Sequence, residues 1–217
     1  MDGSEAHDEL IPAARGDGTP GMALLRAFEG EDPLVILDRI VARDPLDLGR
    51  RCSAWLREHA LLLDPSRLFG ESLIEVAAEA SLGDLPADGR AWLEQRLQRA
   101  ATRLLRRDAE AERNGTPPGE DNPHAFLVEY FGVTPGTELL ASVRFNALPQ
   151  SVRTTYFDVV VEDHPPRVLA GRTGRRPEEI VEDAWEGMMA LGIVQEVDKE
   201  FVVAELLGGN DSKGDRR

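Results

Sequence analysis

The chain has 217 residues, 41% of them hydrophobic, and a formal net charge of −15 at pH 7. This length and apolar content allow one large or two small domains with a substantial core. The negative charge opposes nonspecific nucleic-acid binding and favours solubility or basic protein partners. The single cysteine, Cys52, excludes an intrachain disulfide. No apolar run approaches membrane-spanning length and the acidic N-terminus is not a signal-peptide pattern, so we expect a cytoplasmic protein without a membrane partner.

Residues 1–21 are rich in Gly, Asp, Ala and Pro, which predicts a disordered tail. Residues 22–113 show helical spacing of apolar positions and form the first predicted helical domain. Within it, Asp64 predicts an N-cap and Pro65 the first turn of a helix. That helix is expected to bury Leu68, Phe69, Leu73, Ile74 and Val76. The longest predicted helix, about 88–112, has a basic side and an apolar stripe made of Trp92, Leu93, Leu97, Ala100, Ala101, Leu104 and Leu105.

Residues 114–123, NGTPPGEDNP, are polar and broken by prolines, which predicts a linker. The second predicted domain, 124–207, begins with the apolar segment HAFLVEYF. From Leu148 three helices follow: one from Pro149, a short one over about 166–172, and one from Pro177 to Leu191. Gly174 between the last two predicts a left-handed helix end, and this arrangement indicates a helix-turn-helix.

The side chains of the last two helices are expected to divide into buried and exposed sets. The short helix should bury Val168 and Leu169, with Ala170 as a further candidate. The final helix should place Ile180, Ala184, Gly187 and Leu191 on one buried face. Its exposed positions then include Glu178, Glu179, Glu182, Asp183 and Glu186.

After this unit, apolar residues within 193–197 and 201–203 flank Asp198, Lys199 and Glu200, which favours a β-hairpin wing. The alternative is a helical tail over 193–207. Residues 208–217 are polar and predict a second disordered tail. The predicted fold is therefore mainly α-helical, with two helical domains. The second domain is a helix-turn-helix that is followed by the β-hairpin wing or, in the alternative, by the helical tail.

The pattern from Leu148 to Leu191 resembles the fourth conserved region of bacterial sigma factors, particularly the extracytoplasmic-function type. The match includes Leu148, Pro149, Arg153, Glu162, Leu169, Ala170, Gly174, Ile180 and Leu191. In that family the third helix carries basic or polar residues into the DNA major groove. Here five acids stand at the exposed positions and repel phosphate. The candidate DNA contacts are Arg167, Arg172, Arg175 and Arg176, which are equally compatible with solvated turn charges.

The first predicted domain resembles the second conserved region of the same family, which implies binding to RNA polymerase core. Asp64, Leu68 and Glu71 reproduce the spacing of the acidic helix that contacts the polymerase, with Leu68 expected in the core and Glu71 exposed. A second match runs from Trp92-Leu93 to Leu105-Arg106-Arg107. Between Gly83 and Trp92 no aromatic cluster is available to hold a flipped promoter base, so promoter melting is not expected.

The sequence shows no constellation of residues for catalysis or metal binding. His7, His59, His124 and His164 lack metal-ligand spacing, and no Ser-His-Asp or Cys-His pattern occurs. We therefore expect no catalytic residue, metal site or cofactor, and no enzymatic activity. The leading prediction is a transcription-related protein that binds RNA polymerase core and contacts DNA weakly. The alternative is an acidic interaction module with a sigma-like fold, which binds a basic protein or an anti-sigma partner without reading DNA.

Overall fold

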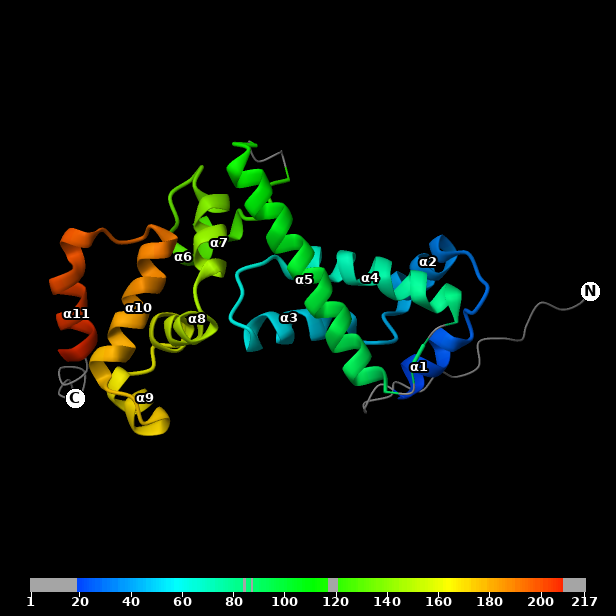
Figure 1. The fold of residues 1–217 in the computed structure, drawn as a ribbon, viewed down its shortest axis with the longest axis horizontal. Coiled ribbons are helices and arrows are strands. Elements are labelled where there is room, and N and C mark those ends of the chain that lie inside the picture. Colours follow the sequence, from blue (N-terminus) through cyan, green and yellow to red (C-terminus); the bar gives the residue numbers. More distant parts are fainter. Residues whose placement is uncertain (1–18, 84, 87, 117–120, 209–217) are drawn as a thin grey trace, which may run out of the picture.

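The computed structural model describes residues 19–83, 85–86, 88–116 and 121–208, and within these residues the chain forms helices and no strand. The predicted mainly α-helical class is confirmed. Helices α1–α5 lie toward one end of an elongated molecule and α6–α11 toward the other (Figure 1). None of the described helices is both long and apolar enough to cross a membrane.

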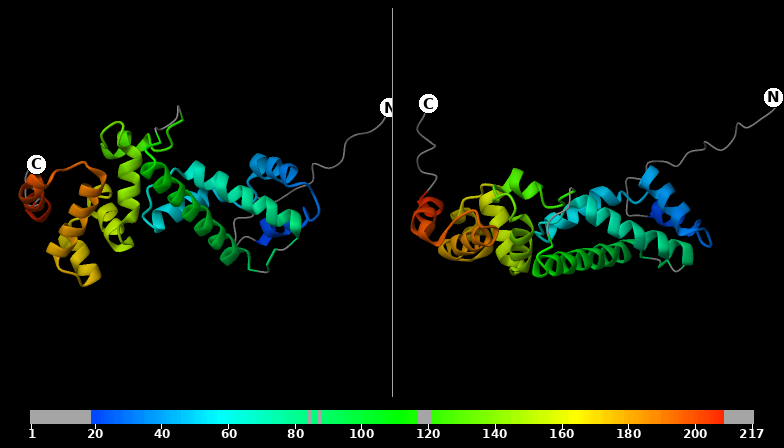
Figure 2. Two further views of the ribbon diagram at one scale, coloured as in Figure 1. Left: turned by 45° about the horizontal axis from the view of Figure 1, so that its top comes forward. Right: turned by 90° about the horizontal axis from the view of Figure 1, so that it is seen from above.

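The helices are short except for α4 and α5, which lie side by side (Figure 2). The first group comprises α1 (Thr19–Arg26), α2 (Pro33–Arg43), α3 (Leu48–Glu58), α4 (Pro65–Leu82) and α5 (Gly89–Arg113). The second group comprises α6 (Phe126–Phe131), α7 (Glu138–Ala147), α8 (Gln150–Tyr156), a π-helical segment (Phe157–Val161), α9 (Pro166–Thr173), α10 (Pro177–Leu191), a 3₁₀ turn (Glu196–Asp198) and α11 (Lys199–Gly208).

The first core lies among α1–α5, and its helix starts follow the predicted caps. Asp64 accepts a hydrogen bond from the Ser66 N–H at 2.7 Å, with Pro65 in the first turn of α4. The predicted apolar stripe of α5 is buried from Trp92 to Leu104. Ile74 is 60% exposed, so its predicted burial is wrong. It lies one turn from the exposed Ala78, on the side of α4 opposite the buried positions.

A second core forms where α8 and α10 cross. Phe145 and Tyr156 are fully buried there, with their rings edge to face at 5.1 Å. Gly187 permits the crossing, because a Cβ at that position would lie 2.7 Å from the Tyr156 Cβ. A smaller cluster beside it contains Val159, Leu169, Ile180 and Ala184. Val168 is 45% exposed, so its predicted burial is wrong, because the eight-residue α9 buries only Pro166 and Leu169.

The two groups of helices are joined by the segment after α3, which α7 and α8 hold by its backbone. Leu62 belongs to the second core, and its N–H and C=O both bond to the side chain of Asn146. Arg153 is 9% exposed, and its guanidinium donates to the backbone carbonyls of Ala60 at 2.9 Å and His59 at 3.0 Å. It also donates to the carbonyls of Asn146 and Leu148. Burial lowers the pKa of Arg153, and the carbonyls take the place of a carboxylate partner.

The predicted linker and tails fall mainly outside the described residues. Of the predicted linker 114–123, residues 117–120 lie outside them, and so do residues 1–18 and 209–217 of the two tails. At the near side of the linker, the Thr116 N–H bonds to the Ala111 carbonyl at 3.0 Å. At the far side, His124 is buried against α4 and α5.

The β-hairpin wing predicted after α10 is wrong, and the helical tail is the alternative that the chain adopts. Gly192, at a φ of 69°, ends α10, and the 3₁₀ turn and α11 follow. Asp198 accepts a hydrogen bond from the Gln195 N–H at 3.0 Å, and Lys199 begins α11 and pairs with Glu182 at 2.7 Å. The polar triplet 198–200 therefore starts a helix, since it lacks the Asn-Gly or Gly residues of a tight hairpin turn.

Candidate protein-binding surface and metal-ligand cluster

Helices α9 and α10 are joined by a tight turn at Gly174. The φ of 71° at Gly174 is left-handed, and its N–H bonds to the Ala170 carbonyl at 2.9 Å. Pro177 stands in the first turn of α10, as predicted, and the Glu179 carboxylate accepts the Arg176 N–H at 3.3 Å. The predicted inner face of α10 is confirmed, because Ile180, Ala184, Gly187 and Leu191 are all buried.

The five acids predicted to be exposed on α10 divide into two sets. Glu178, Glu182 and Glu186 are exposed and follow one another at four-residue spacing, so they form one row along the outer face. Glu179 and Asp183 are half-buried and turned toward the arginines of the turn. The outer face of α10 is thus acidic along its length, and we call Glu178, Glu182 and Glu186 the α10 acidic row.

Of the four candidate DNA contacts, the two in the turn are engaged within the chain. Arg175 is 2.7 Å from the Asp183 carboxylate, and it donates to the Thr155 hydroxyl at 3.1 Å. Arg176 is 2.7 Å from Glu179, and its hydrogen bonds to that carboxylate raise the pKa of Arg176. These pairs leave less of the turn's positive charge for phosphate than the sequence indicated.

The other two candidate DNA contacts, Arg167 and Arg172, are exposed on α9. Neither has an acidic oxygen within 4.0 Å among the described residues. They stand five residues apart, which on a helix places them on different sides. The structure therefore brings the four arginines to one end of the unit without forming a single basic face.

The three residues of the predicted polymerase contact are used mainly inside the chain. Asp64 caps α4 and Leu68 is fully buried, as predicted. The side chain of Glu71 is only 15% exposed, so its predicted exposure is wrong. It accepts hydrogen bonds from Arg103 at 2.9 Å and Arg107 at 2.7 Å, because α5 packs its basic side on α4. Burial opposes ionisation of Glu71, but these two arginines outweigh it and lower the pKa of the carboxyl group.

The same pairing of α4 acids with α5 arginines continues from Glu71 to Glu79. Glu75 bonds to Arg103, and Glu79 accepts from Arg96 at 3.0 Å and from the Trp92 indole at 2.6 Å. We call Glu71, Glu75 and Glu79 the α4 acidic row. The basic side of α5 therefore serves largely to neutralise α4, which the sequence alone did not indicate.

At the far end of this interface the signs are reversed. Arg67 of α4 pairs with Asp108 of α5 at 2.8 Å, and the buried His124 Nε2 lies 3.5 Å from the same carboxylate. Burial disfavours the Asp108 anion, but the bonds and charges of His124 and Arg67 outweigh it and lower its pKa. This buried group ties the start of the second half of the chain to α4 and α5.

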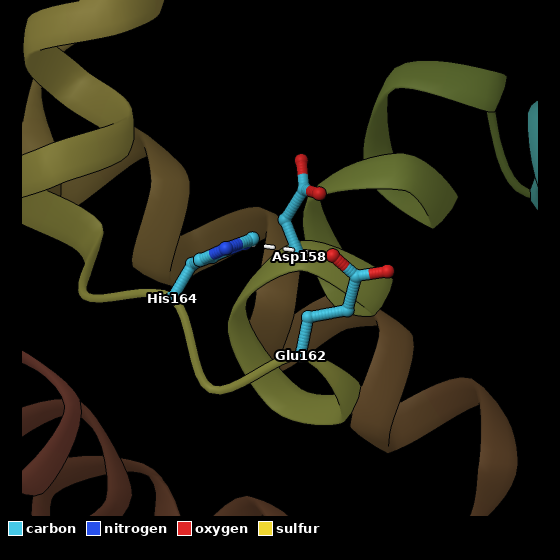
Figure 3. Close-up of side chains that lie close together, drawn as sticks. All are labelled: Asp158, Glu162 and His164. Atoms are coloured by element: carbon cyan, nitrogen blue, oxygen red, sulfur yellow. Dashed lines mark ion pairs between the residues drawn. The ribbon is translucent and has the colours of Figure 1, made fainter.

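A separate group of potential metal ligands lies between α8 and α9. Asp158 in the π-helical segment, Glu162 at its end and His164 in the following loop have ligand atoms within 4.8 Å of one another (Figure 3). Burial and the nearby Glu162 carboxylate raise the pKa of Asp158, and His164 and Arg172 act in the opposite direction. Sequence reasoning missed this group because it considered only histidine and cysteine spacings. The sequence pattern D-x₃-E-x-H alone does not show that the three side chains meet. They meet because the loop before Pro165 folds back on the π-helical segment, where the His164 N–H bonds to the Asp158 carbonyl.

These surfaces define a mainly helical protein with one exposed acidic row, one internally neutralised helix pair and one small group of nitrogen and oxygen ligands. In comparisons with known proteins, no family model, no curated protein and no solved structure matched the chain. Its function is therefore inferred from its own residues and their geometry.

Proposed function

We propose that this chain is a sigma-factor-like transcription protein whose α8–α10 unit is a helix-turn-helix adapted to bind a basic protein surface. The observation that carries this proposal is the charge arrangement on that unit. The α10 acidic row is exposed, whereas Arg175 and Arg176 are paired with Asp183 and Glu179. Carboxylates along an exposed helix face repel phosphate and attract lysine and arginine side chains.

The order of the elements supports the sigma-like part of the proposal. The capped helix from Asp64 precedes a long helix that carries Trp92, and the three-helix unit with a left-handed turn at Gly174 follows later in the chain. This is the order of the two conserved regions that the sequence resembles. RNA polymerase core is therefore the proposed partner. Because Glu71 is engaged by α5, the α10 acidic row provides exposed charge for that contact.

A direct binding measurement tests this proposal. The full chain is immobilised and purified RNA polymerase core is passed over it, with the wild type compared to the triple variant Glu178→Lys, Glu182→Lys and Glu186→Lys. A matched control, Glu29→Lys, Glu58→Lys and Glu129→Lys, makes the same change of net charge at exposed sites away from α10. We expect the triple variant to lose core binding and the control to retain most of it. Undiminished binding by the triple variant would show that the acidic row is not the contact.

A second candidate function is weak DNA contact through α9. Arg167 and Arg172 favour it, because both are exposed without an ion pair among the described residues. Duplex binding by the full chain should be very weak at physiological salt, and Arg167→Glu with Arg172→Glu should abolish what there is. The double charge reversal Arg175→Glu with Arg176→Glu is the comparison. It should also weaken duplex binding, and it breaks the ion pairs of these arginines with Asp183 and Glu179. Tight, sequence-selective binding that survives both double reversals would contradict the assignment of α10 as a protein-binding helix.

A further inference from the structure

The loop between the π-helical segment and α9 holds an imidazole against two carboxylates. The His164 backbone N–H donates to the Asp158 carbonyl at 2.9 Å, which returns the chain toward the segment it has just left. Figure 3 shows the His164 ring turned toward the side chains of Asp158 and Glu162. The three residues lie within seven positions of one another in the sequence, so the local backbone fixes their relative positions.

The ring nitrogen that faces the carboxylates has no hydrogen-bond partner. The Nδ1 atom of His164 is itself shielded from solvent, although the side chain as a whole is 36% exposed. It lies 3.7 Å from the nearest Glu162 oxygen, which is too far for a hydrogen bond. Buried polar atoms are rarely left in this condition, and a bound cation would satisfy the lone pair of this nitrogen. The unpartnered nitrogen and the convergence of three ligand atoms within 4.8 Å together distinguish this group from an ordinary solvated pair of acids.

We propose that Asp158, Glu162 and His164 bind a divalent first-row transition-metal ion, for which Zn²⁺ is the reference probe. Imidazole nitrogen suits zinc and its neighbours, and carboxylate oxygen is compatible with the same ions. Three protein ligands leave at least one coordination position for water or for a group from a partner. The proposal does not depend on the proposed function.

The geometry needs only a small closure around the ion. Bonds of about 2.1 Å place two ligand atoms at most about 4.2 Å apart, whereas the present atoms lie within 4.8 Å. Glu162 can supply this movement, because its side chain is 50% exposed. Asp158 and His164 are held more firmly by the backbone bond between them. The charge of Arg172 acts on Asp158 and opposes a cation, so the affinity should be moderate.

A bound ion would fix the orientation of α9 relative to α8 and the π-helical segment. The three ligands span the end of the π-helical segment and the loop that enters α9 at Pro166. Bridging them would restrict that loop and thereby the placement of α9 beside α10. The metal would therefore be a structural ion that stabilises the α8–α10 unit, which also carries the α10 acidic row.

The test uses the full chain, freed of metal with a chelator and titrated with Zn²⁺ by calorimetry and with Co²⁺ by visible absorption. We expect one ion per chain and a rise in Tm with Zn²⁺. His164→Ala and Asp158→Asn should each weaken binding by at least ~10-fold, since even residues behind the ligands have effects of that size. Asp163→Asn is the matched control, because it removes a neighbouring charge without removing a ligand and Asn tolerates the φ of 54° found there.

Two results would overturn the metal site. One is the absence of saturable Zn²⁺ or Co²⁺ binding by the wild type. The other is equal binding and equal Tm gain in wild type and His164→Ala, which would indicate an ion bound adventitiously elsewhere. Should His164→Ala change the circular-dichroism spectrum of the apo protein, Glu162→Gln replaces it as the deciding variant, because Glu162 is half exposed and its loss should not disturb the fold.

Discussion

Two helices of this protein carry the same pattern of charge and use it in opposite ways. The α4 acidic row and the α10 acidic row each consist of three glutamates at four-residue spacing. On α4 all three glutamates meet arginines of α5, with side chains 15%, 19% and 26% exposed at Glu71, Glu75 and Glu79. On α10 only Glu182 has an ion-pair partner among the described residues, and its side chain is 59% exposed.

The difference shows that a row of acids acquires its role from the helix packed against it. The α4 row is largely buried because α5 runs antiparallel to α4 and places an arginine beside each of its three glutamates. The α10 row faces outward because α8 covers the opposite face of the helix. Stability should therefore respond to changes in the first row, and partner binding to changes in the second.

The largest effect is expected for Glu79→Ala. Arg96 is only 8% exposed and the Trp92 indole bonds to the same carboxylate, so removing it leaves a buried charge and a buried donor unpaired. We expect a loss of about 3 kcal/mol in the free energy of unfolding, measured by urea denaturation. The matched change on the outer row, Glu186→Ala, should stay within about 0.5 kcal/mol. Similar losses for the two variants would remove the distinction between the rows.

A smaller loss is expected for Glu71→Arg. The new guanidinium would stand beside Arg103 and Arg107, which now bond to the carboxylate. The lost charged hydrogen bonds predict a decrease of roughly 1–2 kcal/mol in unfolding free energy, again measured in urea. Glu71→Gln, which keeps one acceptor, should lose less. If charge reversal at Glu71 left stability unchanged, this end of the α4 row would be as free as α10 and available for a partner.

Acid should weaken the reversed pair at the end of the same interface. The folded-state pKa of Asp108 is lower than its ordinary value of 3.8, so its contribution to stability is fully present above that value. It is lost as the pH falls below 3.8 and through the lower folded-state pKa. Urea denaturation over a series of acidic pH values should therefore show a shallower decrease for Asp108→Asn than for the wild type. Parallel curves would mean that Asp108 gains nothing from Arg67 and His124.

The smallest stability effect is expected for Glu182→Gln. Its pair with Lys199 is exposed, and exposed pairs contribute little to stability because solvent screens them. The change in Tm should be close to the error of a thermal melt, and raising the salt concentration should remove it. A loss comparable to that of Glu71→Arg would indicate that α11 depends on this pair for its position against α10.

Sequence reasoning succeeded where local chemistry decides the structure. Asp64 and Pro65 start α4, Gly174 ends α9, and the spacing of Ile180, Ala184, Gly187 and Leu191 gives the buried face of α10. These outcomes depend on capping, on left-handed backbone geometry and on helical periodicity. Each of these is determined by residue types at short spacing, so it can be predicted from the sequence.

Three of the failures, at Glu71, Ile74 and Val168, share a physical cause, which is that tertiary packing decides what surrounds a side chain. Glu71 was expected at the surface, but α5 covers it with arginines whose match to α4 no local pattern reveals. Ile74 and Val168 are apolar and exposed because their helices bury other faces. The hairpin expected within 193–207 failed for a different reason, since the apolar runs there suit strand and helix alike.

The Arg153 contacts attach the two halves of the chain through the main chain and not through side chains. Its acceptors at Ala60, His59, Asn146 and Leu148 are main-chain carbonyls, which persist whatever side chain is attached. The bonds from Arg153 therefore do not depend on the side chain of residue 59, whereas Ala60 is constrained by its burial and its φ of 49°. Position 153 admits few replacements, because a lysine cannot reach several carbonyls from one planar fork. Across variants of this chain, this part of the attachment between the two halves would be recorded at position 153 and not in the side chain of residue 59.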